Sequence, residues 1–128
     1  MTPSKPKRPT EAELDVLRVL WTRGPSTVRE VHEAIRSHRV AYTTTLKTMQ
    51  VMHEKGLLRR DESKRSHVYH ARVGEERTQR QLVRSLLDQA FSGSRPTLLL
   101  RALSDRPVAP EELAELRRIL REVEKENE

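Results

Sequence analysis

Four threonines and one lysine are concentrated in the stretch YTTTLKT, residues 42–48, at the start of a segment with helical periodicity. Threonine is a poor helix former, because its branched side chain loses rotamer freedom against the preceding turn. It nevertheless suits a DNA groove, since its hydroxyl forms hydrogen bonds and its methyl can contact thymine C5. The residues that share one outward face at helical spacing are Thr43, Thr44, Lys47 and Thr48, while Thr45 lies between this face and the apolar one. The pattern predicts a helix that reads base edges.

A basic segment follows this helix. Arg59, Arg60, Lys64 and Arg65 lie where a hairpin would reach a neighbouring groove or the DNA backbone. A second interpretation of the threonines stays open, in which Thr43 caps the helix and the others are ordinary surface residues. A charge run is often only a solvated face. Its coincidence with an order of helices and a hairpin favours DNA binding.

Capping signals and periodicity indicate which elements would position these residues. Thr10 and Glu13 have capping-box spacing, and the apolar pattern after them stops at Gly24, which predicts a first helix. Thr27 and Glu30 repeat this spacing for a second, short helix. The apolar residues predicted to face inward are Leu14, Leu17, Leu20, Trp21, Val28, Val31 and Ile35.

A third helix and a hairpin complete the front part of the chain. The helix is predicted to begin near Tyr42, to present Leu46, Met49 and Met52 inward, and to end at Gly56. The segments LLRR and HVYHARV are rich in strand formers and are separated by the polar DESKRS, which predicts a β-hairpin. The expected fold is therefore mainly α with a small β-hairpin wing, a winged helix-turn-helix domain.

Three further helical patterns occupy residues 74–128, with Pro96 and Pro110 near the starts of the second and third. They share few apolar partners, so a second copy of the chain would cover what one copy leaves exposed. The residues predicted to form this homodimer contact are Leu82, Leu86, Leu87, Phe91, Leu113, Leu116, Leu120 and Val123. We divide the chain into a flexible basic arm (1–9), a winged-helix DNA-binding domain (10–73) and a helical dimerisation domain (74–128).

The composition fits this division. Of the 128 residues, 34% are hydrophobic and 34% are charged, which leaves a small core that gains from association. Residues 1–74 hold fifteen Lys and Arg against eight Asp and Glu, a balance of +7, and residues 75–128 hold ten against eleven, a balance of −1. The basic surplus lies in the front part, as expected of a part that binds a polyanion.

Several other classes of protein are not expected. The absence of cysteine fits a reducing cytoplasm. No apolar run approaches the roughly eighteen residues of a membrane span, and no signal-peptide pattern follows the N-terminus, so we expect a soluble, cytoplasmic protein with no direct membrane binding. His67 and His70 would point to opposite faces of a strand, so they are not expected to share a metal ion. Without a motif for nucleophilic catalysis or nucleotide binding, we expect neither an enzyme nor a cofactor.

Five segments resemble, in this order, the penicillinase repressor family, which includes the BlaI and MecI type and a copper-responsive CopY branch. They are PTEAELDVLRVLW, TVREVHEAI, AYTTTLKTMQVMHEKGLL, KRSHVYHARV and EELAELRRIL. The resemblance covers residues 10–124, and the YTT run followed by KGLL thirteen residues later is its specific part.

This resemblance implies a homodimeric transcriptional repressor that binds a palindromic operator, of antibiotic-resistance or stress genes, and that dimerises through its C-terminal helices. It places Tyr42 with Thr43, Thr44 and Lys47 on the base-reading segment, and Arg65 and His67 on the wing. It also implies a partner, a membrane-bound zinc metallopeptidase sensor that responds to β-lactams and leads to cleavage in the dimerisation region.

The chain departs from the family pattern in three ways. Val51-Met52 stands where the family often has Arg-Leu, which removes an arginine that would contact a phosphate. Arg101-Ala102 replaces the Asn-Phe cleavage dipeptide of the staphylococcal branch, and the cysteine pairs of the copper-responsive branch are absent. Two alternative functions stay open: a ligand-sensing winged-helix regulator, for which four aromatic residues offer little pocket lining, and a protein-interaction module without DNA readout.

Overall fold

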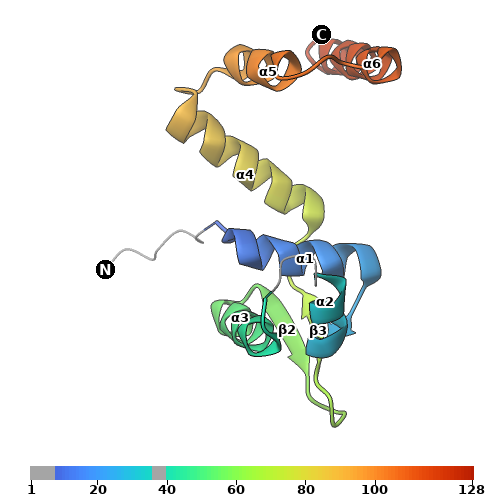
Figure 1. The fold of residues 1–128 in the computed structure, drawn as a ribbon. Helices are drawn as coiled ribbons and strands as arrows, with labels where there is room; N and C mark the ends of the chain where they lie inside the picture. The colour runs from blue at the N-terminus through green and yellow to red at the C-terminus, as the bar shows by residue number, and fades with distance from the viewer. Residues whose placement is uncertain (1–7, 36–39) are drawn as a thin grey trace. The chain divides into compact units, whose positions relative to one another are not determined.

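The computed structural model describes residues 8–35 and 40–128. Its elements are α1 (Glu11–Arg23), β1 (Ser26–Thr27), α2 (Val28–Ala34), α3 (Tyr42–Lys55), β2 (Leu58–Asp61), β3 (Val68–Ala71), α4 (Glu75–Ala90), α5 (Arg95–Ser104) and α6 (Pro110–Glu126). Figure 1 shows these elements, which form a first unit that reaches Arg84 and a second unit, Ser85–Glu128. The expectation of a mainly helical winged-helix fold with a small β-sheet is confirmed.

The division between the two compact units falls inside α4 rather than between residues 73 and 74. The start of α4 belongs to the first unit, where Thr78 is buried and its Oγ1 donates a hydrogen bond to the Gly74 carbonyl oxygen at 2.8 Å. The functional boundary between DNA binding and dimerisation stays a prediction.

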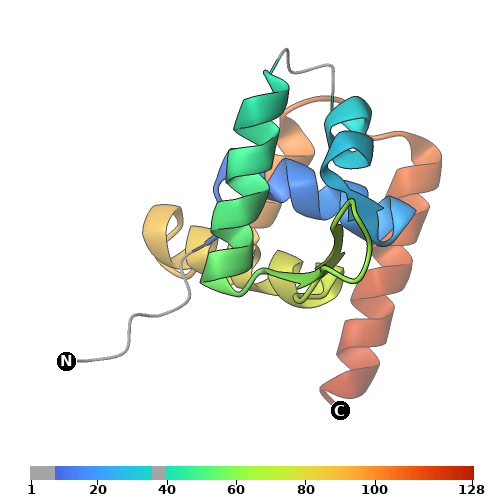
Figure 2. The ribbon, with the colours of Figure 1, turned by 90° about the horizontal axis from the view of Figure 1, so that it is seen from below.

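The helix α1 begins and ends where its sequence signals predict. The backbone N–H of Glu13 donates to Thr10 Oγ1 at 3.1 Å and that of Thr10 donates to Glu13 Oε1 at 2.9 Å, so both halves of the capping box are present. The helix ends at Gly24, whose φ of 92° favours glycine. Figure 1 shows α1 above α2 and α3, Figure 2 shows it behind them, and the helix packs against both of them and against β3.

The short helix α2 starts with a second capping box. The backbone N–H of Glu30 donates to Thr27 Oγ1 at 3.2 Å, and that of Thr27 donates to Glu30 Oε1 at 2.9 Å. The bond from the Thr27 backbone, a bond with the Thr27 side chain and then the charge of Arg23 hold the pKa of the Glu30 carboxyl below its ordinary value. Residues 36–39, at the end of the segment that predicted this helix, lie outside the described residues.

The sheet has one more strand than the predicted hairpin. β2 and β3 pair antiparallel, with Arg59 opposite His70 and Arg60 opposite Tyr69. β1 pairs with the other edge of β3, giving the order β1-β3-β2. The sequence did not predict β1 because it is only two residues long and its last residue also caps α2. This strand ties the start of α2 to the hairpin.

The first unit encloses one hydrophobic core. The buried apolar residues are Val16, Leu17, Leu20, Val28, Val31, Met49, Met52, Leu58 and Tyr69. The prediction of Leu14 as a core residue is wrong, because Val16 shares the buried face of α1 with Leu17 and Leu20 while Leu14 stays half-buried. Trp21 packs against the core and its Nε1 donates to the Val73 carbonyl oxygen at 2.9 Å, which anchors the end of the sheet region to α1.

The second unit has helices at the predicted places but none of its residues is buried. Ser94 caps α5, with Pro96 in the first turn, and α6 begins at Pro110. Among the predicted dimer residues, those left exposed are Leu86, Leu113, Leu120 and Val123, and those half-buried are Leu82, Leu87, Phe91 and Leu116. Exposed apolar residues that the prediction did not include are Val83, Leu99, Leu100 and Ile119.

Candidate nucleic-acid interface

The first turn of α3 is not capped by a threonine. Ala41 occupies the N-cap position, and its carbonyl oxygen accepts hydrogen bonds from the backbone N–H groups of Thr44 and Thr45, at 3.0 and 3.2 Å. The interpretation of Thr43 as a capping residue is therefore wrong. The Thr43 side chain is exposed and has no role in starting the helix.

The predicted outward residues of α3 lie together. Thr43, Thr44 and Lys47 are exposed and Thr48 is half-buried. All four line a groove of about 410 Å³ that α3 forms with the start of α1; the other lining residues are Thr10, Ala12, Glu13 and Val51. The structure thus brings the four predicted side chains to one face of the molecule.

Thr45 lies on the opposite side of α3, inside the first unit. It is only 3% exposed, and its Oγ1 lies 3.0 Å from His32 Nδ1 of α2. This hydrogen bond fixes the rotation of α3 against α2, because a buried hydroxyl that lost its partner would raise the free energy of the fold. Of the three consecutive threonines, only Thr43 and Thr44 are therefore accessible to a ligand.

Two residues of α2 contact the ring of Tyr42, which remains partly exposed. His32 makes an edge-to-face contact with it, with centroids 5.6 Å apart and an interplanar angle of 88°. The guanidinium carbon of Arg29 lies 5.5 Å from the ring centroid, a cation–π arrangement. Tyr42 is still 39% exposed. The start of α3 therefore carries a partly exposed tyrosine whose ring contacts both His32 and the Arg29 guanidinium.

The two hairpin arginines of β2 have different surroundings, because neighbouring strand residues point to opposite faces. Arg59 is exposed, whereas Arg60 is partly covered and lies 3.4 Å from Glu62 Oε1. A hydrogen bond with the Tyr69 side chain, and then the charge of Glu62, hold the pKa of the Arg60 guanidinium above its ordinary value. Arg60 is thus more restrained than the sequence suggested.

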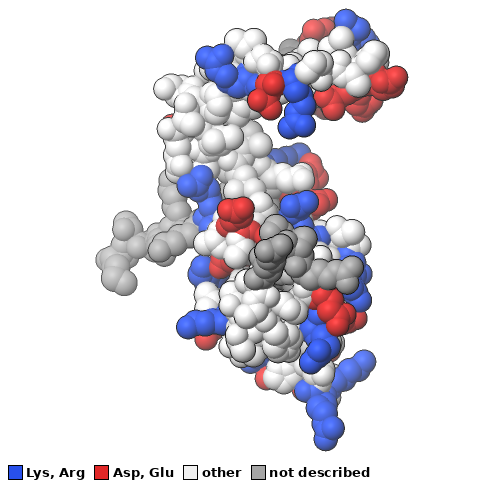
Figure 3. All heavy atoms as spheres, viewed as in Figure 1, with Lys and Arg blue, Asp and Glu red and all other residues white. Residues whose placement is uncertain are grey.

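The turn of the hairpin carries the most exposed cations of this region. Lys64 and Arg65 are exposed there, and Figure 3 shows basic side chains gathered at the tip of the hairpin, the lowest point of the view. His67 Nε2 lies 3.9 Å from Glu62 Oε1, and both side chains are partly exposed. The Ser63 backbone N–H donates to Asp61 Oδ1 at 3.0 Å, which orders the turn.

A hollow of about 430 Å³ lies between the start of α2, the face of α3 and the hairpin. It brings together predicted residues from two regions, Tyr42 from α3 and Arg60, Arg65 and His67 from the hairpin. The sequence prediction missed two of its lining residues, Arg29 and Gln50. Gln50 follows Thr43 and Lys47 at helical spacing, so its place could have been read from the sequence, whereas that of Arg29 depends on how α2 packs.

An ion pair joins α3 to α1, and only its acidic partner is buried. Lys55 Nζ, near the end of α3, donates to Glu13 Oε2 at 2.7 Å, and the Glu13 side chain is only 5% exposed. Burial alone would raise the pKa of the Glu13 carboxyl, but the bonds from Lys55 and Thr10 outweigh it and lower that pKa. The pair fixes the end of α3 to the start of α1.

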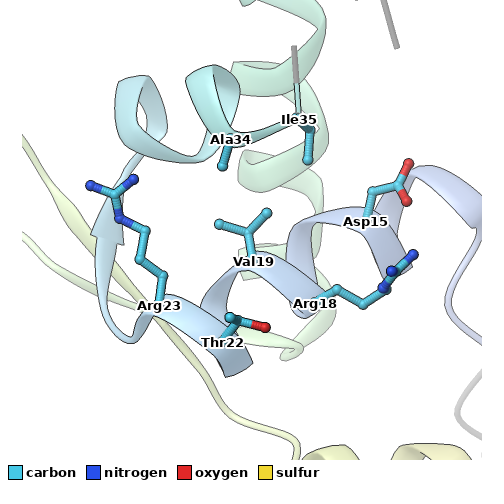
Figure 4. Close-up of a pocket in the computed structure, with 7 residues that line it drawn as sticks. All are labelled: Asp15, Arg18, Val19, Thr22, Arg23, Ala34 and Ile35. Atoms are coloured by element: carbon cyan, nitrogen blue, oxygen red, sulfur yellow. The ribbon is translucent and has the colours of Figure 1, made fainter. Parts of the chain in front are cut away.

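Another hollow, of about 640 Å³, lies between α1 and α2 (Figure 4). Its lining residues are Asp15, Arg18, Val19, Thr22, Arg23, Ala34 and Ile35, which include no aromatic side chain. Val19 and Ile35 form its apolar wall, and Figure 4 shows the charged groups of Asp15, Arg18 and Arg23 away from that wall. This lining does not have the enclosed apolar character of a small-molecule site.

Residues 8–35 and 40–128 contain no group of three or more His, Asp or Glu side chains placed to hold a metal ion. Within the same ranges, no helix combines the length and apolar character needed to cross a membrane.

The fold and the basic face define a winged helix-turn-helix protein, a class of DNA-binding transcription regulators whose recognition helix enters the major groove. The sequence model of the penicillinase repressor family matches residues 9–122, and the chain belongs to this family. The resemblance stated from the sequence is thereby confirmed.

Relatives agree with this assignment. Two Mycobacterium tuberculosis proteins, from strains CDC 1551 and H37Rv and each named transcriptional regulator BlaI, are 36% identical over 117 residues, which is 89% of this chain and 83% of the relative. The penicillinase repressor of Staphylococcus aureus is 22% identical over 115 residues, 89% of this chain and 91% of the relative.

Proposed function

We propose that this protein is a homodimeric, sequence-specific transcriptional repressor that occupies a palindromic operator. One observation carries the proposal: hydroxyls and cations from α2, α3 and the hairpin line two hollows that both border the exposed side of α3. Such groups, drawn from separate elements around one helix, suit a ligand with both base edges and a phosphate backbone. The names of the relatives, transcriptional regulator and penicillinase repressor, support the same function.

The proposed contacts follow from exposure and chemistry. Thr43, Thr44 and Lys47 would lie in the major groove with Thr48 at its edge, because they form the exposed face of α3. Tyr42 would contact the flanking phosphates from the start of this helix. The hairpin residues proposed to contact the adjacent backbone or minor groove are Arg59, Arg60, Lys64, Arg65 and His67. We add Arg29, whose guanidinium shares the hollow with Arg65.

The proposed homodimer contact lies on the helices from α4 onward, with Leu82 at the end of the first unit and the other predicted residues in the second. Leu120 is 52% exposed and Leu100 is 57% exposed, in helices with no buried residue. Large exposed apolar patches mark interaction surfaces, and a two-fold dimer would match a palindromic operator. Two linked half-site contacts raise operator affinity through effective concentration.

Release from the operator would follow inactivation of the second unit. The relative's name, penicillinase repressor, supports control of antibiotic-resistance genes, and a membrane metallopeptidase sensor is the partner proposed to start release. Binding to operator DNA implies a cytoplasmic site of action. Arg101-Ala102 lies within α5, so cleavage there would require this helix to unwind locally.

A mobility-shift experiment tests DNA readout. Fragments of the gene's own promoter and a scrambled fragment are compared at two salt concentrations, because counterion release makes phosphate contacts salt-dependent. We expect selective binding by the wild type and its loss in the double variant Thr44→Ala with Lys47→Ala. The matched control is Thr22→Ala with Arg18→Ala, which removes the same kinds of group from the exposed surface of α1. Equal binding of both fragments by the wild type would support an interaction module instead.

A further inference from the structure

The exposed stripe of α3 continues beyond the threonines to Gln50. Thr43, Lys47 and Gln50 are separated by four and then three residues, so they lie along one line of the helix surface. All three are exposed, and Met49 beside Gln50 is fully buried. At about 1.5 Å per residue the stripe is roughly 10 Å long, which matches about three base pairs at a spacing of about 3.4 Å.

The direction of Gln50 is fixed by contacts on the other side of α3. Met49 and Met52 hold the helix in the core, and Thr45 bonds to His32. Lys55 anchors the end of the helix to Glu13 at 2.7 Å. Because α3 is fixed at three points along its length, its outward stripe has one orientation, which is what base readout requires.

Gln50 differs chemically from its neighbours in the hollow. Arg29, Arg60 and Arg65 from α2 and the hairpin are cations suited to phosphates, whereas Gln50 is neutral and carries both a donor and an acceptor. No hydrogen bond joins its side-chain amide to any other residue in the described part of the chain. Glu54, one turn further, is an exposed acid that would repel the backbone, so the stripe available to DNA ends at Gln50.

We propose that Gln50 is a specificity-determining residue that reads one adenine in each operator half-site, through a bidentate hydrogen bond to adenine N6 and N7. A glutamine amide matches this donor and acceptor pair in the major groove, whereas Lys47 suits a guanine edge or a phosphate. The inference rests on the proposed function, since it assumes that α3 enters the major groove. In the hollow between α2, α3 and the hairpin, the arginines would then contact the DNA backbone and Gln50 would contact a base.

Selection from a random duplex library with the full-length protein tests this inference. We expect the wild type to select a motif with one adenine per half-site whose replacement lowers affinity about tenfold or more. Gln50→Ala should keep the rest of the motif and lose the preference at that position. Gln50→Glu should move the preference toward cytosine, because a carboxylate accepts from cytosine N4. Gln79→Ala, which changes an exposed glutamine of α4, is the matched control and should select the wild-type motif.

The outcomes separate the two ideas. A wild type that selects no motif would overturn the proposed function together with this inference. A selective wild type whose motif is unchanged in Gln50→Ala would overturn the role of Gln50 alone and leave the repressor function standing. Circular dichroism melting of each variant tests whether a lost base preference comes from lost folding. We expect unchanged melting, because Gln50 is exposed and its replacement leaves the core intact.

Discussion

Both units of this protein contain helices with apolar residues, but the two units differ in whether these residues are buried. Among its described residues, the first unit buries nine apolar side chains in one core, and its buried Thr45 hydroxyl bonds to His32. The second unit has three helical segments and no buried residue, with Ile119, Leu120 and Val123 exposed along α6. An amphipathic helix gains stability mainly by covering its apolar face. The first unit therefore completes its core within one chain, whereas the second leaves its apolar residues uncovered, which supports the proposed homodimer.

The largest expected effect comes from charging the exposed apolar face of the second unit. Leu120→Asp should prevent dimerisation in sedimentation experiments and lower operator affinity by a factor on the order of 10² to 10⁴, because the second half-site contact is lost. Ala114→Asp introduces the same charge on the other side of α6 and should leave the dimer intact. A Leu120→Asp protein that sediments as the wild type would remove the second unit from the proposed homodimer contact.

Truncation in the core of the first unit should have the next largest effect. Leu17 is fully buried, so Leu17→Ala should lower the free energy of unfolding by about 2–5 kcal/mol. This loss should not depend on protein concentration. The equivalent truncation Leu120→Ala should instead alter stability in a concentration-dependent way, since it acts on association. Urea unfolding followed by circular dichroism at two protein concentrations measures the unfolding free energy of both variants. The same concentration dependence for both would contradict the proposed difference between the two units.

Removal of the ion pair behind α3 should have a smaller effect that depends on pH. Lys55→Met should cost about 1–2 kcal/mol at neutral pH, less than a fully buried pair because Lys55 is partly solvated. The pKa of Glu13 is lowered in the fold from an ordinary value of 4.5. Its stabilising contribution is therefore complete above this pH and is lost as the pH falls through the folded-state pKa.

The pH dependence supplies the check on this prediction. The difference in unfolding free energy between wild type and Lys55→Met should shrink as the pH falls below about 4.5. Lys47→Met makes the same change on the exposed face of α3 and should show no such trend. A difference that stays constant down to acid pH would show that Lys55 acts through packing alone.

The smallest expected effect comes from the threonine that faces the core. Thr45→Val keeps the shape but removes the hydroxyl bonded to His32, which should lower the free energy of unfolding by about 1 kcal/mol. Thr44→Val changes an exposed threonine and should stay within about 0.5 kcal/mol of the wild type. Thermal unfolding compares the two, and equal losses would argue against a separate structural role for Thr45.

Local signals predicted most of the fold. The capping boxes at Thr10 and Thr27 and the left-handed Gly56 at the end of α3 are present where the sequence indicates them. β1 could not be predicted, since a two-residue strand has no periodicity of its own and exists only by pairing with β3. The assignment of Leu14 to the core failed because two faces of one helix were apolar, and only packing against α2 and α3 selected the face with Val16.

The sequence by itself determined where helices begin and end, which family the chain belongs to, and which stripe of α3 points outward, because these depend on neighbouring residues. Only the tertiary structure decided how the rest of α3 packs and which residues of other elements lie beside that stripe. It placed Thr45 against His32, brought Arg29 and Gln50 into one hollow with Arg65, and left the apolar residues of the second unit exposed. These features depend on residues far apart in the chain, and contacts of that kind are set by packing rather than by local preference.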